Sequence, residues 1–366
     1  MVKKCFGFVL VGILIVLLIG CASAPAEQRD EPAAFTADFA IEDLGDGIKK
    51  VTDAEGRVFL VIPEGQTPPA EYDNIPVINT PVERVLLTST TQAGLISPLD
   101  VWDRIAGVAA SADQWHIAEI TEGLDNGSIA YVGEAWSPDY EKIRQLNPGL
   151  AFVYTGEFGL HDMIAKLDEM QIPYVVINDY LENDPRAEIE WVAFMSTFFN
   201  KYDEALDYIE QAKLNIDEIE SNVGSKEKPK VAWGFIFEGT AHVPNAGSHS
   251  AAMIRLAGGE YVFNDIGVDQ GGSIQISLEE FYSRAKDADV LIYSSILDFT
   301  PNIEAVIEAA PILEGIAPIQ QGNVWAFTPQ YFQMIHKRDS MIEDLAAIFH
   351  PGEFEAQGFY VNMPRN

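Results

Sequence analysis

Short apolar runs alternate with amphipathic stretches along most of the chain. In the first half the apolar runs are residues 85–87, 105–108, 150–153 and 174–177, and helix-like stretches such as 139–146 and 160–170 lie between them. The same alternation recurs in the second half, at residues 231–237, 261–263, 290–293 and 324–327. Buried strands that alternate with helices are typical of parallel α/β layers. The pattern therefore predicts two α/β halves.

Two consecutive helices are predicted between the halves. Residues 188–199 look helical up to Asn200, and residues 202–222 carry one apolar stripe, formed by Ala205, Ile209, Ala212, Ile216 and Ile219. Spacings of four and three residues place this stripe on one helical face. At about 1.5 Å per residue the second helix spans about 30 Å, enough to connect two lobes. We therefore expect an N-terminal lobe at 47–200, a stiff linking helix at 201–223 and a C-terminal lobe at 224–366.

A hairpin is predicted before the first α/β half. Residues 48–52 and 58–62 are rich in β-branched and apolar residues, and they flank the turn sequence Asp53-Ala54-Glu55-Gly56. The stretch before it is polar and rich in Pro, Ala and Glu near its start. This composition predicts a flexible tether over residues 21–46.

The N-terminus has the pattern of a secretory signal. Residues 6–19 are strongly apolar and follow Lys3 and Lys4, but the run is shorter than the roughly 20 residues that cross a bilayer. The sequence Leu18-Ile19-Gly20-Cys21 resembles the lipobox of bacterial lipoproteins, in which a lipid is added to the Cys thiol and the chain is cut before it. The resemblance implies a lipoprotein signal peptide at 1–20 and a lipid on Cys21. The mature protein would then be anchored to a bacterial membrane on its extracytoplasmic side, either in a periplasm or on the outer face of the cell. A plain signal peptide or a short membrane anchor is the alternative.

Loss of this leader would change both cysteine content and charge. Cys21 would be the only remaining cysteine, so no internal disulfide is expected. The mature chain would keep 21 basic and 56 acidic residues, a net charge of −35 against −33 for the whole sequence. Such a charge argues against nucleic acid as a partner and against a basic membrane-binding patch.

Several short motifs occur in a characteristic order. They are VTDAEGR and VERVLL at the start of the first lobe, DYEKIRQLNPGLAFVY within it, NKYDEALDYIEQ opening the linking helix, and GSHSAAMIRLAGGEYVFND, ISLEEFYSRAKDADVLIY and IFHPGEF in the second lobe. Together they resemble the substrate-binding lipoproteins of ABC importers for iron–siderophore, haem and cobalamin complexes, over residues 48–350. The resemblance implies two Rossmann-like lobes with parallel central sheets, joined by a single long α-helix. It also implies capture of a metal chelate for an ABC permease dimer with a cytoplasmic ATPase. Gly149 departs from the aspartate usual in the family.

The resemblance assigns a docking role to two glutamates. In the family, one glutamate on each lobe enters a basic pocket of the permease, and the matching positions here are Glu141 and Glu279. Two carboxylates on opposite lobes would fix the orientation against arginines. The alternative is that both are ordinary solvated helix residues, as befits a chain with 56 acidic residues.

The ligand is expected in the cleft at the carboxyl ends of the strands, where open α/β sheets generally bind ligands. Aromatic side chains suit a large flat ligand, because stacking adds to area burial. The expected contacts in the first lobe are Trp115, His116, Trp136, Tyr154 and Phe158. Those in the second lobe are Phe237, Glu238, His242, Ser295, Asp298, Phe299, Tyr331 and His336. Trp191, Trp233 and Trp325 lie inside helix or strand patterns and are expected in the core.

Other functions fit the sequence less well. Binding of a bare metal ion would need His116, His242, His249 and His336 to converge, and no His pair has metal-ligand spacing. We therefore predict no metal ligands and no cofactor of the protein's own. Catalysis is disfavoured because GSHSA around Ser248 does not fit the G-x-S-x-G elbow, and neither H-E-x-x-H nor C-x-x-C occurs. A lipoprotein receptor that is not coupled to transport is a further alternative.

The chelate itself is suggested by the scarcity of basic residues. Anionic ferric siderophores and the propionates of haem call for basic partners, and the predicted cleft segments offer little beyond Lys337 and Arg338. We therefore expect a ferric siderophore of neutral or cationic type, such as a hydroxamate chelate. A corrinoid or haem is the alternative. Separately, we expect the binding protein to be a monomer.

Overall fold

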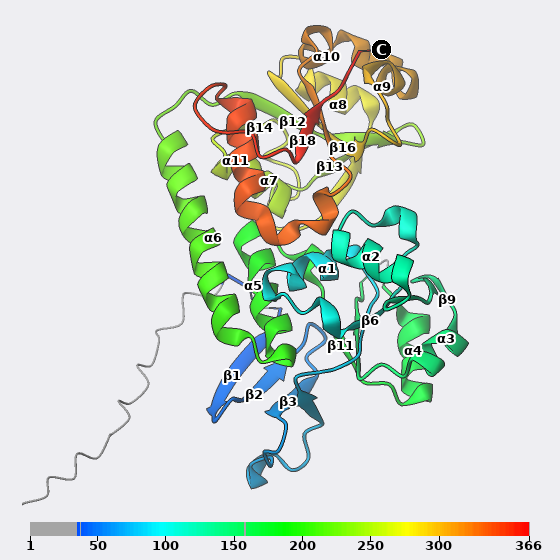
Figure 1. The fold of residues 1–366 in the computed structure, drawn as a ribbon. Helices are drawn as coiled ribbons and strands as arrows, with labels where there is room; N and C mark the ends of the chain where they lie inside the picture. Colours follow the sequence, from blue (N-terminus) through cyan, green and yellow to red (C-terminus); the bar gives the residue numbers. More distant parts are fainter. Residues whose placement is uncertain (1–34, 37, 157–158, 366) are drawn as a thin grey trace, which may run out of the picture. The chain divides into compact units, whose positions relative to one another are not determined.

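The computed structural model describes residues 35–36, 38–156 and 159–365, which form two α/β lobes joined by a long helix (Figure 1). The sheet of the N-terminal lobe has the order β11-β10-β5-β6-β7, and all neighbouring strands are parallel. Its strands are β5 (Val85–Leu87), β6 (Ile105–Val108), β7 (Ala130–Tyr131), β10 (Leu150–Val153) and β11 (Tyr174–Val176). β6 and β10 are buried at every position, as expected for a parallel sheet covered on both faces. The parallel sheet confirms the predicted α/β class.

Four helices accompany this sheet. They are α1 (Thr90–Ile96), α2 (Ala118–Asn126), α3 (Tyr140–Leu146) and α4 (His161–Met170), and a small hairpin of β8 (Gly133–Glu134) and β9 (Ser137–Pro138) precedes α3. A capping box starts α1: the Ser89 hydroxyl accepts from the Thr91 N–H, and the Ser89 N–H donates to the Gln92 side chain. This cap fixes Thr91 just beyond the carboxyl end of β5.

A four-stranded sheet precedes the parallel one. It contains β1 (Ala40–Gly45), β2 (Ile48–Thr52), β3 (Val58–Pro63) and β4 (Val77–Thr80), in that order. β2 and β3 form the predicted antiparallel hairpin. β1 shows that the expected tether over 21–46 is wrong at its end, because residues 40–45 pair with β2. The polar composition hid this strand, although Ile41 and Leu44 turn their side chains toward the protein.

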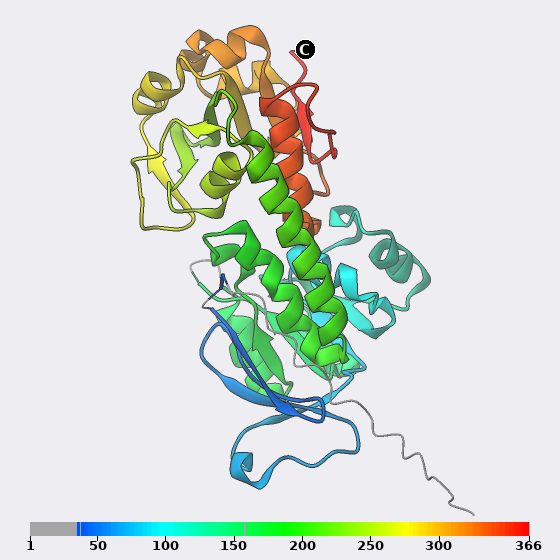
Figure 2. The ribbon, with the colours of Figure 1, turned by 90° about the vertical axis from the view of Figure 1, so that its left-hand side faces the viewer.

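The connection between the lobes is helical. α5 (Pro185–Ser196) continues as a 3-10 turn at Thr197–Phe199, and Asn200 ends it in a left-handed conformation with φ 58°. α6 (Tyr202–Val223) follows and buries the predicted apolar stripe. Figure 2 shows α6 extending from one lobe to the other, with α11 beside it.

The start of the described chain is held against α5. The backbone N–H groups of Phe35 and Thr36 donate to the Glu190 carboxylate over 3.0 and 2.9 Å. The Thr36 hydroxyl donates to Glu182 over 2.5 Å. Glu182 and Glu190 are buried, so these donors supply part of the compensation that buried carboxylates need.

The sheet of the C-terminal lobe is mixed. Its order is β15-β13-β12-β16-β17-β18, and β14 also pairs with β12. β12 (Lys230–Phe237), β16 (Val290–Ile296), β17 (Val324–Phe327) and β14 (Glu260–Tyr261) are parallel, whereas β13 (Thr240–Pro244), β15 (Ser273–Ile276) and β18 (Tyr360–Asn362) are antiparallel to their neighbours. The helices are α7 (His249–Leu256), α8 (Leu278–Ala285), α9 (Ile303–Ala309), α10 (Ala317–Gln321) and α11 (Arg338–Phe349).

A second contact ties the lobes together at η8 (Tyr331–Gln333) and η9 (Ile335–Lys337). The Gln333 amide donates to the Gln114 carbonyl over 2.6 Å, and its oxygen accepts from the His116 N–H over 2.8 Å. The Gln333 backbone also approaches α1 closely, since a Cβ on Gly94 would lie 2.7 Å from the Gln333 carbonyl oxygen. Only glycine permits this approach.

The predicted signal peptide and Cys21 lie outside the described residues. Within the described ranges, no helix combines the length and apolar character that a membrane crossing requires.

Candidate functional site

A cavity of about 340 Å³ lies where the carboxyl ends of the central strands of both lobes meet. The N-terminal lobe and α5 contribute the residues Thr91, Asp179, Tyr180 and Glu188. The C-terminal lobe contributes Trp233, Phe235, His242, Pro244, His249, Ser250, Gly272, Ser273, Ser294, Phe327, Tyr331, Phe332, Ile335 and Arg338. An adjoining cavity of about 210 Å³ shares Thr91, Asp179 and Tyr180 and extends to Tyr154. The volume of the main cavity falls in the range of small-molecule sites, about 300–1,000 Å³.

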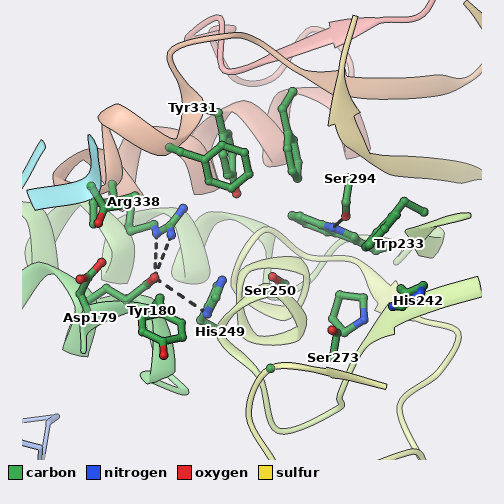
Figure 3. Close-up of a pocket in the computed structure, with 18 residues that line it drawn as sticks. Asp179, Tyr180, Trp233, His242, His249, Ser250, Ser273, Ser294, Tyr331 and Arg338 are labelled. Atoms are coloured by element: carbon green, nitrogen blue, oxygen red, sulfur yellow. Dashed lines mark hydrogen bonds and ion pairs between the residues drawn. The ribbon is translucent and has the colours of Figure 1, made fainter. Parts of the chain in front are cut away.

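The wall from the C-terminal lobe is aromatic. Trp233 and Phe235 are two residues apart on β12, so their side chains point to the same face. The Trp233 indole N–H donates to the Ser294 hydroxyl over 2.8 Å. Phe235 stacks on His242, with ring centroids 4.7 Å apart. This wall provides flat apolar surface, as Figure 3 shows for Trp233 and His242.

The same wall continues after β17. Tyr331 stacks on Phe327 with centroids 4.1 Å apart and an interplanar angle of 4°. Phe332 packs edge-on against Tyr331 and remains 49% exposed, so it lies at the rim.

A buried ion pair between the lobes also lines the cavity. Arg338, at the start of α11, donates to both oxygens of Glu188 on α5, over 2.7 and 2.8 Å. Arg338 is 4% exposed and Glu188 is 1% exposed. Such a bidentate pair is among the stronger charge-assisted contacts in proteins. Figure 3 marks with dashed lines the interactions that Arg338 and His249 make with the same carboxylate.

His249 lies against the same pair. Its Nδ1 is 3.9 Å from Glu188 Oε1 and 3.3 Å from the Glu182 carbonyl oxygen, to which the ring nitrogen donates. Burial lowers the pKa of His249 below its usual range, despite the nearby Glu188 carboxylate. The ring is therefore neutral at physiological pH.

Asp179 is the other acidic group of the cavity. It sits on η5 (Asp179–Leu181), just beyond the carboxyl end of β11, and is 3% exposed. Burial, together with the Glu188 carboxylate, raises the pKa of Asp179 to about 7. Arg338 and a hydrogen bond with Thr91 act in the opposite direction. Asp179 therefore exchanges its proton near neutral pH.

The structure brings together some of the predicted contacts. His242 and Tyr331 line the main cavity, and Tyr154 lines the adjoining one. The structure places Trp115 and His336 in the interior: the Trp115 indole donates to the Ala110 carbonyl, and burial lowers the pKa of His336 to about 3.

The remaining predicted contacts do not line either cavity. His116, Trp136, Phe237, Glu238, Asp298 and Phe299 are exposed at the surface, and Ser295, near the end of β16, contacts the Thr300 hydroxyl. Phe158 lies outside the described residues. Glu141 and Glu279 are exposed in the first turns of α3 and α8, one on each lobe, and their docking role stays a prediction.

Sequence reasoning missed most of the polar groups of the cavity. Glu188 lies in the largely apolar stretch of α5, a position at which a buried charge needs a partner. Asp179 follows the carboxyl end of the buried strand β11. This position is the sequence signal that could have identified it as a site residue. Trp233 was assigned to the core, and it is 1% exposed, but it also lines the cavity.

Metal-ligating side chains do not gather in the part of the chain that the structure describes. Three or more His, Cys, Asp or Glu side chains suited to hold an ion do not meet anywhere within it. His242 and His249 both line the cavity, whereas His116 is exposed and His336 is buried outside it.

Comparisons with known proteins point to one family. The sequence model described as "Periplasmic binding protein" matches residues 85–331. An uncharacterised lipoprotein of Methanocaldococcus jannaschii is 33% identical over 321 residues, which cover 84% of this chain and 76% of that protein.

Solved structures share the fold. A possible iron-binding periplasmic solute-binding protein of Staphylococcus epidermidis has a TM-score of 0.59 at 14% identity, and covers 74% of this chain and 100% of its own. A periplasmic heme-binding protein of Vibrio cholerae has a TM-score of 0.59 at 17% identity, with coverage of 73% and 99%. At these identities the likeness is one of fold.

Proposed function

Because the chain belongs to the periplasmic binding protein family, we propose that it is the extracytoplasmic solute-binding component of an ABC importer and that its cargo is a ferric siderophore. The observation that carries the proposal is the cavity between the two α/β lobes, which is lined by an aromatic wall and by buried polar groups. The apolar body of the chelate would cover the aromatic wall, and its polar groups would face Asp179 and Thr91.

The charges of the cavity support a chelate without net negative charge. Arg338 lines the cavity, and the Glu188 carboxylate already neutralises its positive charge. An anionic ligand would have to displace Glu188 and leave that carboxylate buried without its partner. Removing one member of a buried pair costs about 3–5 kcal/mol, so this exchange is unfavourable.

The proposal includes a lipid anchor on Cys21. The Methanocaldococcus jannaschii relative is a lipoprotein, and the sequence around Cys21 matches a lipobox. A lipid on Cys21 would keep the binding protein near its permease. Metabolic labelling with a fatty-acid analogue tests this: wild type is expected to carry the label and Cys21→Ser to lack it.

The cargo can be tested by titration of the purified protein with a ferric trihydroxamate, haem and cyanocobalamin. We expect the trihydroxamate to bind, with a change in tryptophan fluorescence that a Trp233→Phe variant reduces. Calorimetry on the same variant reports binding independently of fluorescence. Failure of all three compounds to bind would contradict the chelate proposal, and binding of haem or cobalamin alone would replace the siderophore by that ligand.

The docking glutamates are tested separately from the cargo. Glu141→Arg with Glu279→Arg is expected to leave ligand affinity unchanged, because both side chains are exposed and neither lines the cavity. The same variant should fail to stimulate the ATPase of the cognate importer in proteoliposomes, as charge reversal opposes arginine pockets. Full stimulation would show that these residues are ordinary surface acids.

A further inference from the structure

The cavity holds two buried carboxylates and one guanidinium. Arg338 donates from Nε and Nη2 to Glu188, and its third guanidinium nitrogen, Nη1, lies 3.1 Å from the Met341 sulfur. All three guanidinium nitrogens therefore have a partner within the protein, and the group also lies over the Tyr331 ring, 5.6 Å from its centroid. Asp179 is the second carboxylate of the cavity. Among the described residues that line the cavity, no cation pairs with it as Arg338 pairs with Glu188.

Asp179 is 3% exposed and lies where the two cavities adjoin. It lines both the main and the adjoining cavity, together with Thr91 and Tyr180. The Glu188 carboxylate from α5 and Arg338 from α11 are the charged groups that act on it, and Thr91 from α1 is its hydrogen-bonding neighbour. The other titratable side chains around the cavity are Tyr180, His242, His249 and Tyr331.

The balance of these groups favours a positive charge on the ligand. The Glu188–Arg338 pair is neutral as a unit, and burial keeps His249 uncharged. Ionised Asp179 would make the cavity negative, and an incoming cation would offset its desolvation. The net charge of −33 also makes the surrounding potential negative, which attracts cations toward the mouth.

We propose that the cavity is specific for a metal chelate that carries a pendant cationic group, such as a primary ammonium. Asp179 binds that group, and the aromatic wall of Trp233, Phe235 and Phe332 packs against the body of the chelate. Asp179 is then the specificity-determining residue of the site. This inference rests on the proposed function, because it assumes that the cargo is a chelate.

A consequence is coupling between binding and a proton. Asp179 must be ionised to bind an ammonium, whereas in the empty protein it is largely protonated below its pKa of about 7. Binding of the cationic ligand therefore releases a proton below that pH. Affinity should rise between pH 6 and pH 8 and level off above, since the proton no longer competes.

Two probes with the same iron coordination isolate the charge. Ferrioxamine B carries a pendant primary ammonium, and its N-acetyl derivative replaces that group by a neutral amide. Calorimetric titrations of both probes use wild type, Asp179→Asn and the exposed N-lobe control Asp162→Asn. We expect wild type and Asp162→Asn to prefer ferrioxamine B at least tenfold, and Asp179→Asn to bind both probes with similar affinity.

A wild-type pH series keeps the test independent of the variant's folding. The affinity for ferrioxamine B should rise with pH between 6 and 8, and that for the acetylated probe should stay level. Equal affinity of wild type for the two probes, or preference for the acetylated one, would overturn the role of Asp179 and leave the proposed function standing. Failure of both probes to bind would overturn this inference together with the hydroxamate cargo.

Discussion

At the scale of single residues, the cavity is organised around the Glu188–Arg338 pair. The two groups come from helices of different parts of the chain, 150 residues apart, and almost no solvent reaches them. In such surroundings neither charge is tolerable alone. The pair therefore fixes the contact between α5 and α11 and also cancels the positive charge that an anionic ligand would need.

Breaking this pair should destabilise the protein strongly. Glu188→Gln keeps the volume but leaves the Arg338 charge buried, so we expect the free energy of unfolding to fall by about 3–5 kcal/mol. Glu188→Met combined with Arg338→Met should recover most of that loss. The control is the surface pair of exposed Glu83 and partly buried Arg104, and Glu83→Gln should cost less than about 1 kcal/mol. Urea denaturation measures the free energy of unfolding of all three variants. Equal losses for Glu188→Gln and Glu83→Gln would show that burial does not strengthen the dependence on the Glu188–Arg338 pair.

Asp179 should make stability depend on pH in a defined direction. Its folded pKa of about 7 lies above the ordinary value of 3.8. Between these values the folded state holds a proton that the unfolded state has released, so the free energy of unfolding falls as pH rises from about 4 to about 7. The difference corresponds to an upper limit of about 4 kcal/mol.

The Asp179→Asn variant should remove that contribution. We expect it to be more stable than wild type at pH 8 and nearly equal at pH 4, as measured by urea denaturation at both values. Glu182, whose pKa burial raises to about 7, contributes in the same window and leaves a residual slope. If the free energy of unfolding of Asp179→Asn fell with pH as steeply as that of wild type, the raised pKa of Asp179 would be contradicted.

At the scale of elements, α6 is the connection that positions the cavity. Its apolar stripe packs on α5 and α11, which carry the two members of the ion pair. The Tyr208 hydroxyl donates to the His336 carbonyl over 2.8 Å, and the Asn215 amide donates to Asp339 over 2.8 Å. α6 is therefore fastened to both lobes along its length rather than only at its ends.

Two substitutions on α6 should differ widely in effect. Ile216 is completely buried, and Leu214, two residues earlier, is 56% exposed. Ile216→Ala should lower the free energy of unfolding by about 2–5 kcal/mol, through lost burial and a cavity. Leu214→Ala should change it by less than about 0.5 kcal/mol. Chemical denaturation compares the two, and similar losses would mean that the stripe does not carry the packing.

At the scale of the molecule, the two lobes are held at more than one place. α6 connects them, α5 and α11 share the ion pair, and Gln333 bonds to the backbone of the other lobe. Lobes restrained in this way favour small rotations over wide hinge closure.

The predicted consequence is a small change in size on binding. For the mature chain the radius of gyration should be about 20 Å, and ligand should change it by no more than about 1 Å. Small-angle X-ray scattering with and without ferric trihydroxamate measures this. Gln333→Ala removes the cross-lobe bonds and should show a larger difference than wild type. A change of several ångströms in wild type would contradict a stiff connection.

The fold could be predicted largely from the sequence, whereas the candidate site could be predicted only in part. The strands at 105–108 and 150–153 and the stripe of α6 follow from local periodicity, which burial of one face imposes directly on the residues. The strand at Ala40–Gly45 escaped because its pairing partner, rather than its own composition, stabilises it. His242 and Tyr331 were found because they follow central strands, but Phe237 and Phe299 satisfy the same rule and are exposed.

The sequence by itself determined the α/β class, the two lobes and their helical link, and the family, because these depend on periodicity and motif order along the chain. Only the tertiary structure decided which residues meet in the cavity. Asp179 and Glu188 come from one stretch of the chain, and His249 and Arg338 from two others that are far from it in sequence. Their charges and pKa values arise from mutual proximity and shared burial, and packing of the two lobes creates both.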